Sequence, residues 1–118
     1  MFQQTIEQVH QDHVLSIPEG FSNLATTSIC PVHSLVKFYS PPSESASRTE
    51  ILKQIHILTL QGHPEFTSDI VRAIIDVRET KGVLSSDFSA ESRERAGLAH
   101  EGSTLGRTIL EVLFASVE

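Results

Sequence analysis

Residues 51–60, ILKQIHILTL, constrain the fold more than any other part of the chain. They alternate in polarity at first and end almost wholly apolar, which is typical of a β-strand covered on both faces. Gly62 and Pro64 follow immediately and end the strand. We therefore expect residues 51–60 to be the most buried strand of the protein, and such a strand needs helices on both sides of its sheet.

Amphipathic helices follow this strand. Thr67 or Ser68 is suited to cap a helix over residues 67–81, and Gly82 is suited to end it. Its apolar positions keep the 3.6-residue period and are Ile70, Val71, Ile74, Ile75 and Val77. The charged residues 86–98 predict a short exposed helix. Residues 104–117 predict a closing helix capped by Ser103 or Thr104, with one apolar stripe made of Leu105, Ile109, Val112 and Leu113.

The first half of the chain predicts strands and a loop. Turn residues Pro18 and Gly20 follow a weakly strand-like segment, for which we predict a strand over residues 5–10. Residues 32–39 are rich in β-branched and aromatic side chains and predict a second strand. Residues 40–50, SPPSESASRTE, combine paired prolines with serines, and we expect a surface loop that is mobile over residues 41–49.

This order of elements predicts an α/β fold. It matches the trailing portion of a fold with helices over a mostly parallel sheet, in which the early strands and their covering helices are missing. The sheet is therefore expected to be incomplete. A length of 118 residues allows one domain, or part of one, and excludes a two-domain enzyme.

Charge and cysteine content exclude several classes of function. Nine basic against 15 acidic residues give a net charge of −6 without a basic cluster, which argues against nucleic acid and anionic membrane as partners. The single cysteine, Cys30, cannot form an internal disulfide or a cysteine-based zinc site. The N-terminus resembles no signal peptide, and no apolar run approaches the roughly 18 residues of a membrane helix. We therefore expect a soluble cytoplasmic protein.

The segment Gln61-Gly62-His63-Pro64-Glu65 is the leading candidate for chemistry. It lies between the apolar strand and a capped helix, and in open α/β sheets the crevice at the carboxyl ends of the strands is where sites form. Glu65 is placed to accept a hydrogen bond from one ring nitrogen of His63 while the other nitrogen faces a nucleophile. Alternatively, the segment is a plain turn in which Glu65 only favours the next helix N-terminus by its charge. The spacing leaves both interpretations open.

Other groups of polar residues are less informative. His10, Asp12 and His13 lie close together, but their spacing fits no closed zinc pattern, and a polar strand-to-turn junction explains them. The scattered histidines His33, His56 and His100 are expected to be ordinary hydrogen-bonded or solvent-facing side chains. The glycines form no phosphate-binding fingerprint. We therefore predict no metal and no cofactor.

The sequence TLQGHPEFTSDIV resembles the end of class I glutamine amidotransferase domains, in which the last long strand leads into a Gln-x-His-Pro-Glu-Phe motif. The resemblance extends to HQDHVLSIPEGFSNLATTSICPV, similar to the family's His-x-Asp-x-Val segment, Pro-Glu-Gly turn and short strand pair. AHEGSTLGRTILEVLF is similar to the family's closing helix. Residues 1–118 therefore resemble the C-terminal half of a flavodoxin-like class I domain.

The resemblance implies roles for several residues. His63 corresponds to the base of a Cys-His-Glu catalytic triad, and Glu65 corresponds to the residue that orients it. His10, Asp12 and Pro18 correspond to loop architecture near the glutamine site. The family's nucleophile, a cysteine on a Gly-x-Cys-x-Gly elbow, has no counterpart here. Cys30 cannot replace it, because an elbow uses the backbone N–H of the next residue as an oxyanion donor and Pro31 has none.

Three functional interpretations remain open. The first is a relative of glutamine-hydrolysing enzymes that lacks the nucleophile, as a truncated product, an isoform or a degenerate copy. The second is a relative of hydrolases that act on γ-glutamyl peptides. The third is a non-catalytic interaction module that pairs its exposed sheet edge with another chain. The substrate implied for a complete domain is glutamine or a γ-glutamyl compound, and we expect the isolated chain to be marginally stable or to self-associate.

Overall fold

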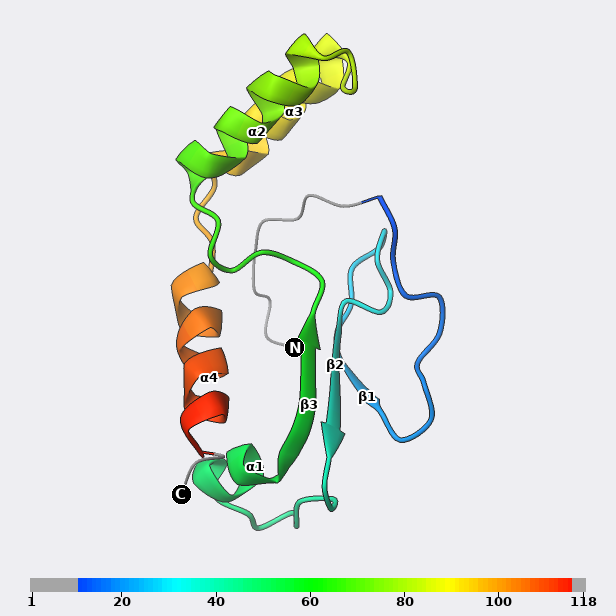
Figure 1. Cartoon of the computed structure of the whole chain (residues 1–118), viewed down its shortest axis with the longest axis vertical. Coiled ribbons are helices and arrows are strands. Elements are labelled where there is room, and N and C mark those ends of the chain that lie inside the picture. Colours follow the sequence, from blue (N-terminus) through cyan, green and yellow to red (C-terminus); the bar gives the residue numbers. More distant parts are fainter. Residues whose placement is uncertain (1–10, 116–118) are drawn as a thin grey trace.

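The computed structural model describes residues 11–115 of the chain. The elements run in the order β1 (Ser22–Ala25), β2 (Ser34–Phe38), α1 (Arg48–Gln54), β3 (Ile55–Leu60), α2 (Ser68–Thr80), α3 (Ser86–Ala96) and α4 (Gly102–Ala115). The molecule is elongated, with principal extents of 50 × 27 × 26 Å. The sheet, α1 and α4 form one end, and α2 and α3 lie side by side at the other end (Figure 1). This mixture of helices and strands confirms the α/β class.

The sheet has the strand order β1-β2-β3, and both pairings are antiparallel. The prediction of a mostly parallel sheet is therefore wrong for the strands that residues 11–115 contain. Parallel neighbours need a crossover connection that passes over a face of the sheet. Here the connection from β2 to β3 contains only the short helix α1, which lies at the end of the sheet, so the chain returns antiparallel (Figure 1).

The most buried strand is β2, not β3. Ser34, Leu35 and Val36 of β2 are all buried, whereas no residue of β3 is fully buried. The prediction for residues 51–60 is wrong on this point because β3 lies at the edge of the sheet, with a strand on one side only among the described residues. The composition of a strand indicates how deeply it favours burial, whereas the elements packed around the strand determine its actual burial.

Residues 51–54 are helical, so the predicted strand over 51–60 begins four residues later, at Ile55. Ser47 caps α1 with a capping box: its hydroxyl accepts from the Glu50 N–H, and the Glu50 carboxylate accepts from the Ser47 N–H. The predicted loop over residues 40–50 is therefore irregular only as far as Ser47. Its mobility stays a prediction.

The structure tests one of the two other predicted strands. The strand over 32–39 is confirmed as β2. The predicted strand over 5–10 lies outside the described residues. In the segment for which the resemblance implies a strand pair, Ser22–Ala25 forms β1 and pairs with β2.

The predicted helices are confirmed with small changes at their ends. Thr67 caps α2 as predicted, with its hydroxyl accepting from the Ile70 N–H, and Gly82 follows the helix with φ +71°. The charged segment forms α3. The closing helix α4 begins at Gly102, so the predicted cap at Ser103 or Thr104 is wrong. Residues 116 and 117 of its predicted range lie outside the described residues.

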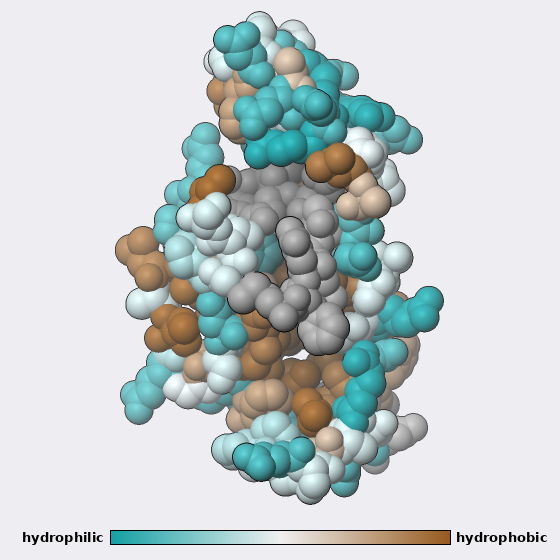
Figure 2. Space-filling model, turned by 180° about the vertical axis from the view of Figure 1, so that it is seen from behind, coloured by the Kyte–Doolittle hydropathy of each residue, from teal (hydrophilic) through white to brown (hydrophobic). Residues whose placement is uncertain are grey.

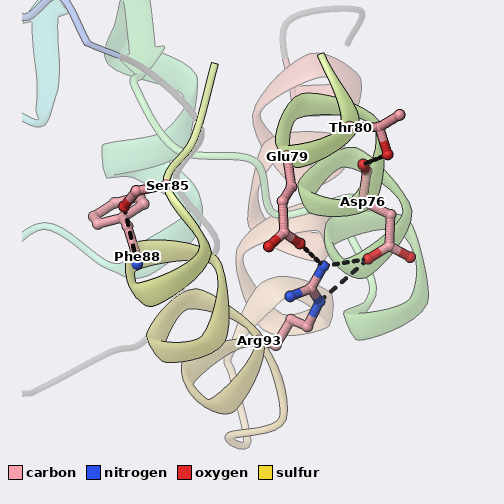
Figure 3. A network of polar contacts seen from close by, with 6 residues as sticks. All are labelled: Asp76, Glu79, Thr80, Ser85, Phe88 and Arg93. Atoms are coloured by element: carbon pink, nitrogen blue, oxygen red, sulfur yellow. Dashed lines mark hydrogen bonds and ion pairs between the residues drawn. The ribbon is translucent and has the colours of Figure 1, made fainter. Parts of the chain in front are cut away.

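Helices α2 and α3 form a hairpin with a small core of its own. Val71 and Ile75 of α2 pack against Ala96 of α3, and Phe66 and Leu84 pack at the margins of this cluster. Figure 3 shows the polar side of the same contact, where Arg93 of α3 donates to both Asp76 and Glu79 of α2. These contacts hold the two helices to each other as a unit that projects from the rest of the molecule (Figure 1).

Apolar surface gathers at the sheet end of the molecule. Seen from behind, the hairpin end is mainly hydrophilic, whereas apolar side chains are frequent over the lower part (Figure 2). On α4 the exposed apolar residues are Leu110, Leu113 and Phe114. Between residues 11 and 115, no helix is long and apolar enough to cross a membrane.

Candidate functional site

The candidate site is a tight turn directly after β3. The ladder between β2 and β3 extends one step beyond the strand, because the Gln61 N–H donates to the His33 carbonyl at 2.9 Å. The chain then turns, and the Phe66 N–H donates to the His63 carbonyl at 3.2 Å. Proline is favoured at the second position of such a turn because its φ is already fixed there, and Pro64 occupies that position. His63 therefore lies just beyond the end of the sheet, and the turn places Glu65 beside it.

The side chains of His63 and Glu65 are in contact, as their spacing predicts. His63 Nδ1 lies 2.9 Å from Glu65 Oε1. An ionised carboxylate can only accept a hydrogen bond, so Nδ1 carries a proton in this pair, and in the neutral imidazole Nε2 then has the lone pair. The hydrogen bond from His63 holds the pKa of Glu65 below its ordinary value. The arrangement leaves an imidazole nitrogen that can take up a proton, with a carboxylate behind the ring to stabilise the imidazolium.

This pair is too exposed to add much to folding stability. The side chain of Glu65 is 63% exposed and that of His63 is 37% exposed. Water screens a pair of this kind, and exposed pairs contribute little to the free energy of unfolding. The contact therefore matters mainly for the orientation of the imidazole ring, which is what a catalytic base requires.

Phe66 is a further part of the site that sequence reasoning did not identify. Its ring is stacked on that of His63, with centroids 4.0 Å apart and an interplanar angle of 5°. Phe66 also packs against the core of the α2–α3 hairpin. The imidazole is thus fixed by a carboxylate at its edge and by an aromatic ring on its face. The signal was present in the Gln-x-His-Pro-Glu-Phe motif, where Phe66 closes the turn.

Gly102 is the second residue that sequence reasoning missed. It is buried at the start of α4, and its backbone lies against the Pro64 carbonyl of the turn. The two residues are far apart in the sequence, and no local pattern links them. The chain therefore runs from the turn at Phe66 into the α2–α3 hairpin. After the hairpin it contacts the same turn again at Gly102.

Cys30 is not placed to serve as a nucleophile. Its side chain is only 2% exposed, and its thiol donates to the Val32 carbonyl, with Sγ and O 3.5 Å apart. Its N–H donates to the Thr27 hydroxyl within a closed turn. These contacts bury the thiol and leave no room for a substrate to approach the sulfur.

The remaining polar residues of interest do not join the turn as a cluster. His10 lies outside the described residues, and Asp12, His13 and Pro18 lie on an exposed segment before β1. Across residues 11–115, no group of three or more His, Cys, Asp or Glu side chains is arranged to hold a metal ion. His56 is stacked on Tyr39, and His33 is buried. His100 accepts from the Gly102 N–H through Nδ1 at 3.2 Å, which places it at the start of α4.

Comparison with known proteins gives two curated relatives that match most of the chain. A protein of Schizosaccharomyces pombe, named as a glutamine amidotransferase-like protein, is 29% identical over 108 residues. A protein of Saccharomyces cerevisiae, named as a glutamine amidotransferase, is 28% identical over 112 residues. Both names mark the assignment as provisional. The chain is a homologue of glutamine amidotransferase-like proteins.

The two matches include 92% and 95% of this chain, but only 37% and 38% of the relatives. The chain therefore spans less than two-fifths of the length of either protein. No protein-family model matches it, and no solved structure does.

Proposed function

We propose that this chain forms part of a flavodoxin-like, class I glutamine amidotransferase domain in which His63 and Glu65 are two members of a Cys-His-Glu triad. The observation that carries the proposal is the 2.9 Å contact between His63 Nδ1 and Glu65 Oε1, in the turn that directly follows β3. The names of the two relatives support the class of reaction, and the Gln61-to-Phe66 motif supports the roles of the two residues.

In the proposed reaction, His63 Nε2 takes the proton from a cysteine thiol, and Glu65 stabilises the imidazolium that forms. The thiolate attacks the side-chain amide carbon of glutamine. The C–N bond then breaks, and ammonia leaves with the proton that His63 returns. Water attacks the resulting thioester with His63 again as the base, so that glutamate is released and the thiol is restored. The net reaction converts glutamine and water to glutamate and ammonia.

The thiol in this proposal comes from outside the 118 residues. Cys30 is the single cysteine of the sequence, and it is buried, hydrogen-bonded to Val32 and followed by a proline. Relatives more than twice as long as the matched region are consistent with a further segment that supplies the nucleophile. The isolated chain is therefore expected to release no ammonia from glutamine.

The decisive experiment uses the longest product encoded by the gene. The transcript is sequenced upstream of the codon for Met1, and a frame that encodes a Gly-x-Cys-x-Gly elbow is expected. That product is assayed for ammonia release from glutamine and, in parallel, from a γ-glutamyl peptide. Activity on the peptide but not on glutamine would assign the chain to the γ-glutamyl hydrolases.

Variants of that product test the roles of the two residues. His63→Ala is expected to abolish ammonia release, and Glu65→Gln is expected to lower kcat by roughly 10² to 10⁴-fold. His56→Ala is the matched control, because this histidine is stacked on Tyr39 and takes no part in the turn. Full activity in His63→Ala, or activity of the isolated chain that Cys30→Ser abolishes, would contradict the proposal.

A non-catalytic interaction module is the second candidate, and two observations favour it. The outer edge of β3 has no strand partner among the described residues, and α4 exposes Leu110, Leu113 and Phe114. Such surface favours association with a second copy of the chain. Sedimentation velocity is expected to show self-association that a Leu113→Lys, Phe114→Lys double variant reduces. A dilute monomer with a sharp cooperative unfolding transition would contradict this expectation.

A further inference from the structure

Gly102 makes the closest backbone approach to the candidate site. It is the first residue of α4 and is buried, although α4 is otherwise largely half-buried or exposed. Its α-carbon lies so near the turn that an added β-carbon would overlap the Pro64 carbonyl oxygen. The same β-carbon would lie 2.8 Å from His100 Nδ1, which is also closer than such atoms approach.

The atom that excludes a β-carbon belongs to the backbone and not to a flexible side chain. Pro64 lies between His63 and Glu65, and its peptide groups connect the two residues. The carbonyl of Pro64 cannot rotate away without turning the peptide bond that leads to Glu65, because the peptide unit is planar. Any side chain at position 102 therefore displaces the segment that holds the imidazole and the carboxylate together.

A second glycine in the same helix provides the comparison. An added β-carbon at Gly106 would meet nothing within 4 Å. No neighbouring atom therefore requires a glycine at position 106. Position 102 requires it. The contact of α4 with the turn depends on the missing side chain at this one residue.

His100 fixes the other side of the same residue. Its Nδ1 accepts from the Gly102 N–H at 3.2 Å, which satisfies one of the backbone donors that are free at a helix start. Gly102 is thus held between an imidazole and the turn. We infer that Gly102 is a positioning residue that fixes the turn carrying His63 and Glu65 through its backbone contact with Pro64. The inference rests on the proposed function, which gives the geometry of the pair its catalytic meaning.

The test measures the contact between His63 and Glu65 directly. The full chain is labelled with ¹³C, and the carboxyl carbon of Glu65 is titrated by NMR. Its pKa is expected below the ordinary value in the unaltered chain, because His63 donates to the carboxylate. His63→Ala gives the reference value without that hydrogen bond. Gly102→Ala is expected to shift the pKa most of the way to this reference, and Gly106→Ala is expected to leave it unchanged.

Two results would overturn the inference. One is a Glu65 titration in Gly102→Ala that matches the unaltered chain, which would limit Gly102 to a role in stability. The other is an equal shift in both glycine variants. If Gly102→Ala does not fold, the unaltered chain is tested by nuclear Overhauser effects between the Hα protons of Gly102 and the protons of Pro64, and the absence of any such effect overturns the inference. None of these measurements needs turnover, so a failure of the proposed enzyme activity is recognised separately.

Discussion

Replacement of Ile75 by alanine is expected to open the α2–α3 hairpin and leave the sheet intact. Ile75 is 5% exposed and belongs to a cluster of only three buried residues. The substitution deletes three carbon atoms, and at about 0.8 kcal/mol for each buried methylene the lost transfer energy is about 2.5 kcal/mol. The cavity that remains adds to this cost, and measured values for such changes run from about 2 to 5 kcal/mol.

This cost is large for a structure of two short helices. Helices of this length are marginal in isolation and depend on packing of their apolar faces. A loss of about 2.5 kcal/mol raises the open population of the hairpin roughly 60-fold, since each 1.4 kcal/mol corresponds to a factor of ten. Few contacts join the hairpin to the sheet, so β2 and β3 are expected to keep their protection.

Amide hydrogen exchange, measured by NMR or mass spectrometry, distinguishes these two regions of the molecule. Ile70→Ala is the matched control, because it makes the same chemical change in the same helix at a residue that is 42% exposed. Its expected cost is below about 1 kcal/mol. The reasoning is refuted if both variants speed exchange in α2 equally, or if Ile75→Ala speeds exchange in β2 as much as in α2.

Two further predictions concern single polar groups. Ser89 has a fully buried hydroxyl with no hydrogen-bond partner among residues 11–115, so Ser89→Ala is expected to raise stability by about 1 kcal/mol in chemical denaturation; a loss of stability would show that the hydroxyl is satisfied in solution. The pKa of Glu65 is lowered by its hydrogen bond from His63, so the stability that this contact adds is present above the ordinary glutamate pKa and is lost as the pH falls through the lowered value. Because the pair is exposed, this contribution is small, and the acid limb of unfolding measured against pH is expected to be slightly shallower in His63→Ala. A steeper acid limb in that variant than in the unaltered chain would contradict the assignment.

Local signals account for the elements that the sequence predicted well. The helix over 68–80 was predictable because its cap, its apolar period and the glycine after it are all features of neighbouring residues in the sequence. Gly82 has the positive φ that is common at helix ends. The same holds for the contact of His63 with Glu65, because the turn around Pro64 fixes it within a few residues.

The start of β3 was mispredicted although a local signal was present. Residues 47–50, SRTE, have the Ser-x-x-Glu pattern of a capping box, and the structure shows both of its hydrogen bonds. The apolar residues Ile51 and Leu52 resemble a strand by composition, yet they lie inside the short helix that this cap begins. A cap outweighs composition over so short a segment because it satisfies two backbone donors at once.

Features that depend on distant residues could not be predicted from the sequence. The antiparallel sheet and the shallow burial of β3 depend on which strands are adjacent, and no pattern within 51–60 specifies its neighbours. The contact of Gly102 with Pro64 is of the same kind. A glycine at a helix start has several explanations in a sequence, and only the folded chain shows that this one faces a carbonyl oxygen.

The site is held by its surroundings more than by its own hydrogen bond. The pair of His63 and Glu65 is too exposed to fix itself, and water competes for both side chains. The turn is restrained on three sides: by the ladder at Gln61, by the stack of Phe66 on the imidazole and by the backbone of Gly102. Two of these restraints lie at the ends of the α2–α3 hairpin, since Phe66 precedes α2 and Gly102 follows α3. The hairpin therefore does more than connect β3 to α4, because any change that separates its two ends also releases the turn that carries the candidate base.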